Sequence, residues 1–218
     1  LAGDDSSVNE EWNCDKGRWA FKYLTSRERV TSPMIRGEDG ELHEASWPEA
    51  IAFAASGLKG KRAGVLVGGR ATVEDAYGYS KFARVALGTN DIDFRSRPHS
   101  DEESSFLTSV ALGLKTTYKD IDKADKVVLL GFEPEEESPI VFLRIYKQVR
   151  KRALAVISDA PFASRGSQKL NAELVTEIST ISGLTAKSVI LVGERLAEKS
   201  GALSSALALA EKSGAKLA

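Results

Sequence analysis

Two groups of side chains in this sequence could do chemistry: a thiol flanked by cations, and a group of four carboxylates. Cys14 stands among loop-forming residues, with Lys16 and Arg18 close behind it. Positive charge favours the thiolate, which is the form of cysteine that ligates metal. A lone cysteine is otherwise usually a small buried hydrophobic residue. Cys14 could supply one of the four ligands of an iron–sulfur cluster, so the remaining ligands would have to lie outside this chain.

The carboxylates lie between a predicted strand and a predicted helix: Glu133, Glu135, Glu136 and Glu137. The apolar run 127–130 predicts a buried strand, and Ser138 with Pro139 predicts the start of a helix that continues to Arg152. Such a junction binds phosphate in open α/β sheets, because the helix presents free N–H groups. Four carboxylates would repel a phosphate there. They could hold a hard cation, but we expect a solvated acidic face that stabilises the following helix.

Two further motifs are less specific. The segment 68–70, Gly-Gly-Arg, follows a strand and precedes a helix, but it has neither the spacing of a dinucleotide-binding motif nor the lysine of a Walker loop. We expect a tight turn. His99 with Asp101 and Glu102 could suggest a metal site, but Ser100 already explains the local pattern as a helix cap.

Other kinds of site find little support. A predicted helix ends with four cations, which complement its dipole: Lys147, Arg150, Lys151 and Arg152. We therefore expect no nucleic-acid patch there. No Ser-His-Asp or Cys-His arrangement is visible, because Cys14 and His43 are far apart in the sequence.

Strand and helix signals alternate after residue 45. Capping boxes at Ser46 and Thr72 open helices that end near Gly57 and Gly88. The other expected elements are strands at 63–67, 91–94, 153–157 and 187–193, a helix from Ser100 through Leu112, a helix at 203–212 closed by Gly214, and an ambiguous stretch at 170–181. This alternation predicts an α/β fold, a doubly wound, mostly parallel, Rossmann-like sheet with helices on both faces. Residues 1–45 predict a small irregular segment that ends in a hairpin around 38–39.

Composition narrows the class of protein. The 218 residues carry 30 basic and 31 acidic side chains, so the net charge of −1 does not favour nucleic acid or an anionic membrane. One cysteine suits a reducing compartment. No run approaches the roughly 18 apolar residues of a membrane span, and no signal peptide is visible. The chain starts at Leu rather than Met and ends on what looks like another strand, so we expect it to be part of a longer protein.

Several motifs then resemble one family in their order along the chain. The stretches 8–19, 29–36 and 45–50 resemble the molybdopterin oxidoreductase superfamily. More closely, they resemble the large iron–sulfur subunits of bacterial NADH-quinone oxidoreductase, respiratory complex I, of the actinobacterial type. The likeness extends over nearly the whole chain through the stretches 73–77, 81–84, 87–93, 131–139 and 193–196.

The resemblance implies a cofactor, partners and a location. It implies that Cys14 is the last ligand of a [4Fe-4S] cluster in the full-length protein, with three ligands upstream of this chain. Lys16 would lie next to that cluster, at the position between cluster and pterin in molybdenum enzymes. Residues 1–45 would end the cluster-binding segment, and 46–218 would form an incomplete molybdopterin-oxidoreductase-like domain. The partners would be other complex I subunits, in electron transfer from NADH to quinone coupled to proton translocation, on the cytoplasmic side of the plasma membrane and without membrane insertion.

The sequence also departs from catalytic members of that family. They hold a molybdenum cofactor with a loop after the third strand and an Asp-Pro-Arg-type motif after the fourth. Here the first loop carries the four glutamates and the second reads Asp-Ala-Pro-Phe-Ala-Ser-Arg at 159–165. Each carboxylate opposes a pyrophosphate by about 1 kcal/mol in water, and Arg70 and Arg165 would offset only part of this. We therefore predict a vestigial pocket without molybdopterin, in a structural part that is inactive alone. The alternatives are a fragment of a molybdenum enzyme such as a formate dehydrogenase, and a free-standing nucleotide-binding module.

Overall fold

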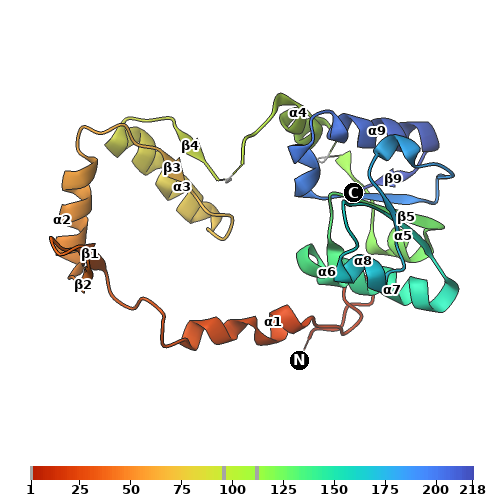
Figure 1. Cartoon of the computed structure of the whole chain (residues 1–218), viewed down its shortest axis with the longest axis horizontal. Helices are drawn as coiled ribbons and strands as arrows, with labels where there is room; N and C mark the ends of the chain where they lie inside the picture. The colour runs from red at the N-terminus through yellow and green to blue at the C-terminus, as the bar shows by residue number, and fades with distance from the viewer. Residues whose placement is uncertain (1, 95–96, 111–112) are drawn as a thin grey trace. The chain divides into compact units, whose positions relative to one another are not determined.

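The computed structural model describes residues 2–94, 97–110 and 113–218, which form two compact units (Figure 1). The α/β unit comprises residues 1–20 and 99–218. The hairpin unit comprises residues 21–98. Each unit is described by itself below.

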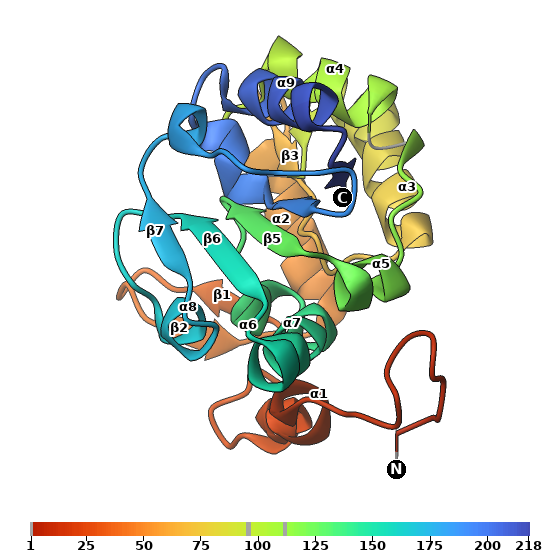
Figure 2. The same ribbon diagram turned by 90° about the vertical axis from the view of Figure 1, so that its right-hand side faces the viewer.

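The α/β unit is built on a sheet of five parallel strands in the order β7-β6-β5-β8-β9 (Figure 2). The strands are β5 (Lys126–Leu130), β6 (Ala155–Asp159), β7 (Glu173–Val175), β8 (Val189–Val192) and β9 (Lys216–Leu217). This sheet confirms the predicted α/β, mostly parallel fold. Strand β6 starts two residues later than predicted, because Ala153 ends the preceding helix in the left-handed conformation (φ 52°).

Alternate residues of the central strand β5 enter two different cores. Val127 and Leu129 pack with Ile145 of α7 (Pro139–Arg152) and with α5 (Tyr118–Lys123) on one face. Val128 and Leu130 pack with α9 (Ala202–Ser213) on the other. Side chains of a strand point alternately to its two faces, and apolar residues on both faces require cover on both. The run 127–130 is therefore apolar throughout because both of its faces are buried.

The remaining helices of the α/β unit are mostly short: α1 (Asp15–Trp19), α4 (Asp101–Ser109), α6 (Pro134–Glu137), α8 (Arg165–Lys169) and the 3-10 turns η4 (Ile178–Thr180) and η5 (Glu194–Glu198). Ser100 Oγ accepts from Glu103 N at 3.1 Å, which confirms the predicted cap of α4; the predicted end at Leu112 lies outside the described residues. Gly214 ends α9 with φ 71°, as predicted. Helix α6 occupies what we predicted as a loop, and Ser138 is the N-cap of α7 without a capping side-chain bond.

The hairpin unit confirms most of its predicted elements. Strands β1 (Met34–Arg36) and β2 (Leu42–Glu44) pair antiparallel, and the 3-10 turn η1 (Ala20–Thr25) precedes them. Both predicted capping boxes form, at the starts of α2 (Trp47–Leu58) and α3 (Val73–Phe82). Helix α3 continues as a π-helical turn, η2 (Ala83–Leu87), which Gly88 ends with φ 65°. Helix α2 ends one residue beyond Gly57.

The prediction of a buried strand at 63–67 was wrong. The strand β3 (Val65–Leu66) has two residues, pairs in parallel with β4 (Ile92–Asp93), and leaves Leu66 75% exposed. These two strands form a separate pair and are not part of the five-stranded sheet. An apolar run predicts a strand, but its burial depends on elements that pack over it.

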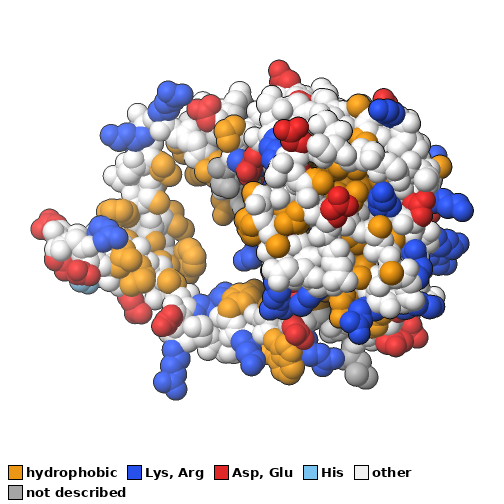
Figure 3. Space-filling view, turned by 45° about the vertical axis from the view of Figure 1, so that its right-hand side comes forward, with side chains coloured by type: hydrophobic (Ala, Val, Ile, Leu, Met, Phe, Trp, Pro, Cys, Tyr) orange, Lys and Arg blue, Asp and Glu red, His pale blue; other side chains and the backbone are white. Residues whose placement is uncertain are grey.

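The helices of the hairpin unit also carry apolar side chains at the surface. Neither α2 nor α3 contains a buried residue. Hydrophobic side chains are correspondingly visible on the surface of this unit in the space-filling view (Figure 3). The exposed large ones on these two helices are Trp47, Ile51, Phe53, Leu58, Val73, Tyr77, Tyr79 and Phe82. The 3.6-residue period of apolar residues therefore predicted helix α3 correctly, but the apolar face of this helix is not buried.

Candidate functional site

The carboxyl ends of β5 and β8 are where this sheet topology would bind a ligand. The chain runs outward from β5 through β6 to β7 and then returns to the other side of β5 at β8. Open α/β sheets bind ligands at such a reversal, outside the carboxyl ends of the strands. The predicted carboxylates directly follow β5, so they lie at this edge of the sheet.

The loops after β5 and β8 pack closely against each other at this edge. The amide of Gly193, after β8, donates to the carbonyl of Leu130 at 2.9 Å. A Cβ added to Gly193 would lie 2.3 Å from the carbonyl oxygen of Gly131. One added to Gly131, whose φ is +57°, would lie 2.4 Å from the amide nitrogen of Leu196. A methyl group at either glycine would therefore have to displace the loop that faces it.

The glutamates beside these loops bind cations of this same unit. Glu135 accepts from Arg165 at 3.0 Å and from Lys169, and its side chain is only 14% exposed. Burial works to raise the pKa of Glu135, but the hydrogen bonds from Lys169 and Arg165 outweigh it and hold the pKa below its usual value. The prediction that Arg165 offsets part of the negative charge is confirmed for Glu135.

Two more glutamates have cationic partners from other elements. Glu137 Oε1 accepts from Arg195 Nη2 at 2.6 Å and from the amide of Glu133 at 2.8 Å. Glu136 pairs with Lys16. The expectation of a solvated acidic face is confirmed for Glu136 and Glu137, which are exposed although they pair with cations, and is wrong for Glu135, whose carboxylate is largely covered. The charge that would repel a phosphate is largely used inside the protein.

Cys14 lies at the N-cap of α1. Its Sγ accepts from the amide of Gly17 at 3.4 Å, and the residue is half-buried. Among the described residues no group of three or more His, Cys, Asp or Glu side chains gathers around a possible metal site.

Lys16 binds the acidic segment rather than standing free. Its Nζ donates to the carbonyl oxygen of Glu136 at 2.9 Å and to the carboxylate of the same residue. The contact joins α1 to α6. Lys16 and Arg165 were both singled out from the sequence, and the structure brings both to the glutamates that follow β5.

The weaker candidates have structural roles. The amide of Ala71 donates to the carbonyl of Gly68 at 3.1 Å, which confirms a tight turn at 68–70. His99 contacts Glu103 through Nδ1 at 3.1 Å. Glu102 accepts from the amides of Ser204 at 2.8 Å and of Gly201 at 2.7 Å, which lower the pKa of its carboxyl and cap α9.

At the end of α7, the cation of Arg152 donates to the carbonyl oxygens of Ala124 at 2.7 Å and Asp122 at 2.9 Å. It therefore serves internal contacts. None of the helices in the described parts of the chain has the length and apolar character needed to cross a membrane.

Sequence reasoning missed an ion pair at the same edge of the sheet, in which a buried carboxylate meets an exposed lysine. Asp159, the last residue of β6, has a side chain that is 1% exposed and accepts from Lys199 Nζ at 3.0 and 3.2 Å. Both residues line a cavity of about 340 Å³ together with Glu177 and Gly201. The predicted strand ended at residue 157, so Asp159 was assigned to the following loop and its burial was not predicted.

Comparison with known proteins gives a consistent result. The profile of the family described as "Molybdopterin oxidoreductase" matches residues 29–204. The whole chain is 50% identical, over 240 aligned positions, to the NADH-quinone oxidoreductase G subunit of Mycobacterium tuberculosis, and 45% identical, over 258, to that of Streptomyces coelicolor. It covers 30% and 31% of those proteins. Over 70% of the chain, it is also 33% identical to the F420-dependent formate dehydrogenase subunit alpha of Methanocaldococcus jannaschii and covers 23% of that protein.

Proposed function

Since the chain belongs to the molybdopterin oxidoreductase family, we propose that it is a structural, cluster-associated part of an NADH-quinone oxidoreductase whose ancestral cofactor pocket is closed. The chain is a homologue of the NADH-quinone oxidoreductase G subunits and spans about 30% of the length of the actinobacterial relatives described above. In this proposal the α/β unit is a scaffold. Cys14 supplies one ligand to a [4Fe-4S] cluster whose other ligands come from outside the chain.

The observation that carries the proposal is the contact between the loops after β5 and β8. The amide of Gly193 and the backbone of Gly131 pack closely at the carboxyl ends of β5 and β8, where open α/β sheets bind ligands, and this packing supports a closed pocket. Glu135, Glu136 and Glu137 add negative charge on one side. The residues present do not fit a pyrophosphate, so we assign no chemistry to a pterin in this chain.

The geometry around Cys14 supports the cluster role. The Gly17 amide donates to Sγ at 3.4 Å, and Lys16 lies two residues on, bound to Glu136. In the assembled protein Cys14 would supply one of the four ligands of the iron–sulfur cluster. The proposed partners are the other subunits of the respiratory complex, on the cytoplasmic side of the plasma membrane, and the proposed activity of the whole is electron transfer from NADH to quinone.

Metal analysis of the full-length subunit tests this function. Iron and molybdenum would be measured by plasma mass spectrometry in the wild type, in Cys14→Ser and in His43→Ser as a control. We expect Cys14→Ser to lose about four irons relative to both other proteins, because a [4Fe-4S] cluster with one missing thiolate is released or degraded. We expect no molybdenum and no pterin in any of them.

The principal competing function is that of a catalytic molybdenum enzyme, which the 33% identity to a formate dehydrogenase subunit favours. Stoichiometric molybdenum and pterin in the wild-type protein would establish it and refute the scaffold. Equal iron in the wild type and in Cys14→Ser would refute the ligand role of Cys14 and leave the closed pocket unaffected.

A further inference from the structure

We propose that Arg144 of α7 is a positioning residue for the segment that carries Cys14. It fixes residues 6–10 on the α/β unit and thereby sets the direction in which the chain reaches Cys14. The anchoring follows from the geometry alone. Its consequence for a cluster rests on the function proposed above.

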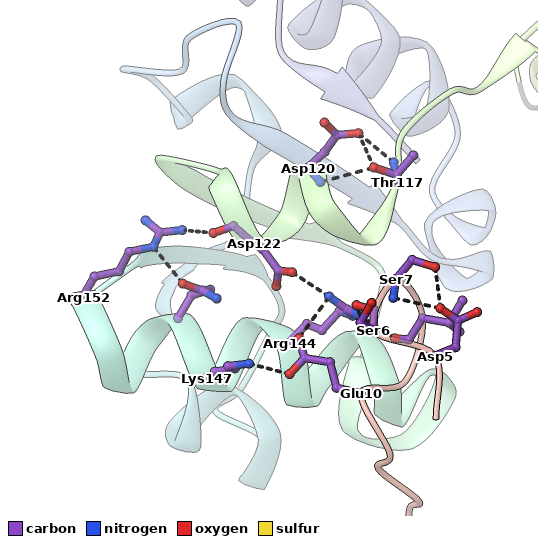
Figure 4. A network of polar contacts seen from close by, with 12 residues as sticks. Asp5, Ser6, Ser7, Glu10, Thr117, Asp120, Asp122, Arg144, Lys147 and Arg152 are labelled. Atoms are coloured by element: carbon purple, nitrogen blue, oxygen red, sulfur yellow. Dashed lines mark hydrogen bonds and ion pairs between the residues drawn. The ribbon is translucent and has the colours of Figure 1, made fainter. Parts of the chain in front are cut away.

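The guanidinium of Arg144 is fully buried and holds the backbone of the N-terminal segment (Figure 4). Nε donates to the carbonyl oxygen of Val8 at 2.9 Å, and Nη2 donates to the same oxygen at 2.7 Å and to that of Ser6 at 3.3 Å. These contacts join residues that are more than 130 positions apart. A planar guanidinium can donate in this fork, whereas a lysine ammonium cannot.

Carboxylates on both sides neutralise the buried charge. Nη1 lies 2.6 Å from Asp122 Oδ2 and 3.6 Å from Glu10 Oε1, and the guanidinium carbon lies 5.3 Å from the centre of the Tyr118 ring. A buried cation is costly unless it is paired and its donors are used. The burial of Arg144 therefore depends on the segment remaining in place.

A second cation of α7 extends the contact toward the cysteine. Lys147, one turn along the helix, pairs with the carboxylate of Glu10, and its Nζ lies 5.2 Å from the ring centre of Trp12. The segment is thus held at Ser6, Val8, Glu10 and Trp12. The last of these is two residues before Cys14.

The backbone of the segment explains why it needs an anchor. Glu10 and Glu11 have φ values of 48° and 63°, so two consecutive residues with side chains adopt the left-handed conformation. Such a conformation is costly for residues other than glycine and persists where the surrounding structure imposes it. The ion pairs of Glu10 with Arg144 and Lys147 are contacts of this kind.

Hydrogen exchange on the 218-residue chain tests the anchoring, with Arg144→Lys compared with Arg152→Lys. Arg152 lies on the same helix, and its hydrogen bonds go to Gln148, Asp122 and Ala124. We expect the amides of residues 7–12 to exchange about tenfold faster in Arg144→Lys, while β5 and α9 keep their protection. Arg152→Lys should match the wild type over residues 7–12.

A second variant, Glu10→Gln, keeps the Arg144–Asp122 pair. It tests the anchoring even if Arg144→Lys unfolds as a whole. We expect it to speed exchange over the same residues by a smaller factor. Unchanged exchange of residues 7–12 in either variant, with β5 still protected, would overturn the anchoring.

The consequence for the cluster is tested in the full-length subunit by the rate at which a chelator removes iron. We expect faster release from Arg144→Lys than from Arg152→Lys or the wild type. If residues 7–12 loosen and iron release is unchanged, Arg144 does not position Cys14. If no iron depends on Cys14 in the wild type, the proposed function fails while the anchoring stands on the exchange data.

Discussion

Gly193 and Gly131 lie in backbone contact: a Cβ added to Gly193 would be 2.3 Å from the carbonyl oxygen of Gly131. This contact lies at the carboxyl ends of β5 and β8, the edge at which doubly wound sheets usually bind ligands. The neighbouring carboxylates and cations are consistent with the closure, because they bind one another.

Gly193→Ala tests the closeness of these loops. We expect it to lower the free energy of unfolding by about 1–3 kcal/mol, because the methyl group must displace the backbone of Gly131. The measurement is urea unfolding followed by circular dichroism. Gly113→Ala, where the added Cβ meets no atom within 4 Å in the described chain, should change stability by less than about 0.5 kcal/mol. Equal stability of Gly193→Ala and the wild type would show that the loops can separate.

Removal of the carboxylates should restore some affinity for anions. The triple variant Glu135→Gln, Glu136→Gln and Glu137→Gln frees four cations: Lys16, Arg165, Lys169 and Arg195. Contacts worth up to about 1 kcal/mol each predict binding of inorganic pyrophosphate with a Kd on the order of 1 mM. Isothermal calorimetry measures it. The wild type should give no heat with pyrophosphate, GTP or NADH.

The control for this variant carries the same change of charge in the hairpin unit: Glu38→Gln, Glu41→Gln and Glu44→Gln. It should bind no pyrophosphate. Binding by the wild type would contradict the closed pocket. Binding by both variants would show that net charge, and not the position of the cations, is responsible.

Asp120 should make stability depend on pH in the acid range. A hydrogen bond from Lys216, followed by those from the amide and hydroxyl of Thr117, lowers the pKa of Asp120 to about 2. Because the folded pKa lies below the unfolded value of about 3.9, this group stabilises the native state above about pH 4, and the stabilisation is lost as the pH falls toward about 2.

Urea unfolding between about pH 5 and pH 2 measures this dependence. Asp120→Asn and Lys216→Gln should both be less stable than the wild type at the upper end of this range and should lose less stability on acidification. Asp4→Asn, at an exposed site, should keep the slope of the wild type. The same slope in Asp120→Asn and the wild type would mean that Asp120 has an ordinary pKa.

The 218-residue chain should not hold an iron–sulfur cluster by itself. After anaerobic treatment with iron and sulfide and removal of the excess, we expect a colourless monomer, because one thiolate cannot hold four irons. Absorbance, iron analysis and light scattering measure this. A brown monomer with about four irons would show that other residues of this chain supply ligands, and Cys14→Ser would then reveal whether Cys14 is among them.

Local signals in the sequence predicted much of the fold. Three kinds of local prediction were correct, because each depends on residues within about four positions. They are the capping boxes at Ser46 and Thr72, the hairpin around residues 38–39, and the glycines that end α3 and α9. The apolar run 127–130 predicted a fully buried strand. The short helix α1, the capping box at Thr117 that opens α5, and α6 were missed.

The α/β class, the family resemblance, the thiol and the four neighbouring carboxylates could all be recognised from local patterns in the chain. The partners of these groups follow from the folded arrangement. Glu135 meets Arg165 and Lys169 across 30 and 34 positions, and Arg144 meets Val8 across 136. Burial of Leu130 and exposure of Leu66 follow from which elements cover each strand. Charge pairing and burial depend on distances in space between residues remote in sequence, and local patterns carry no information about those distances.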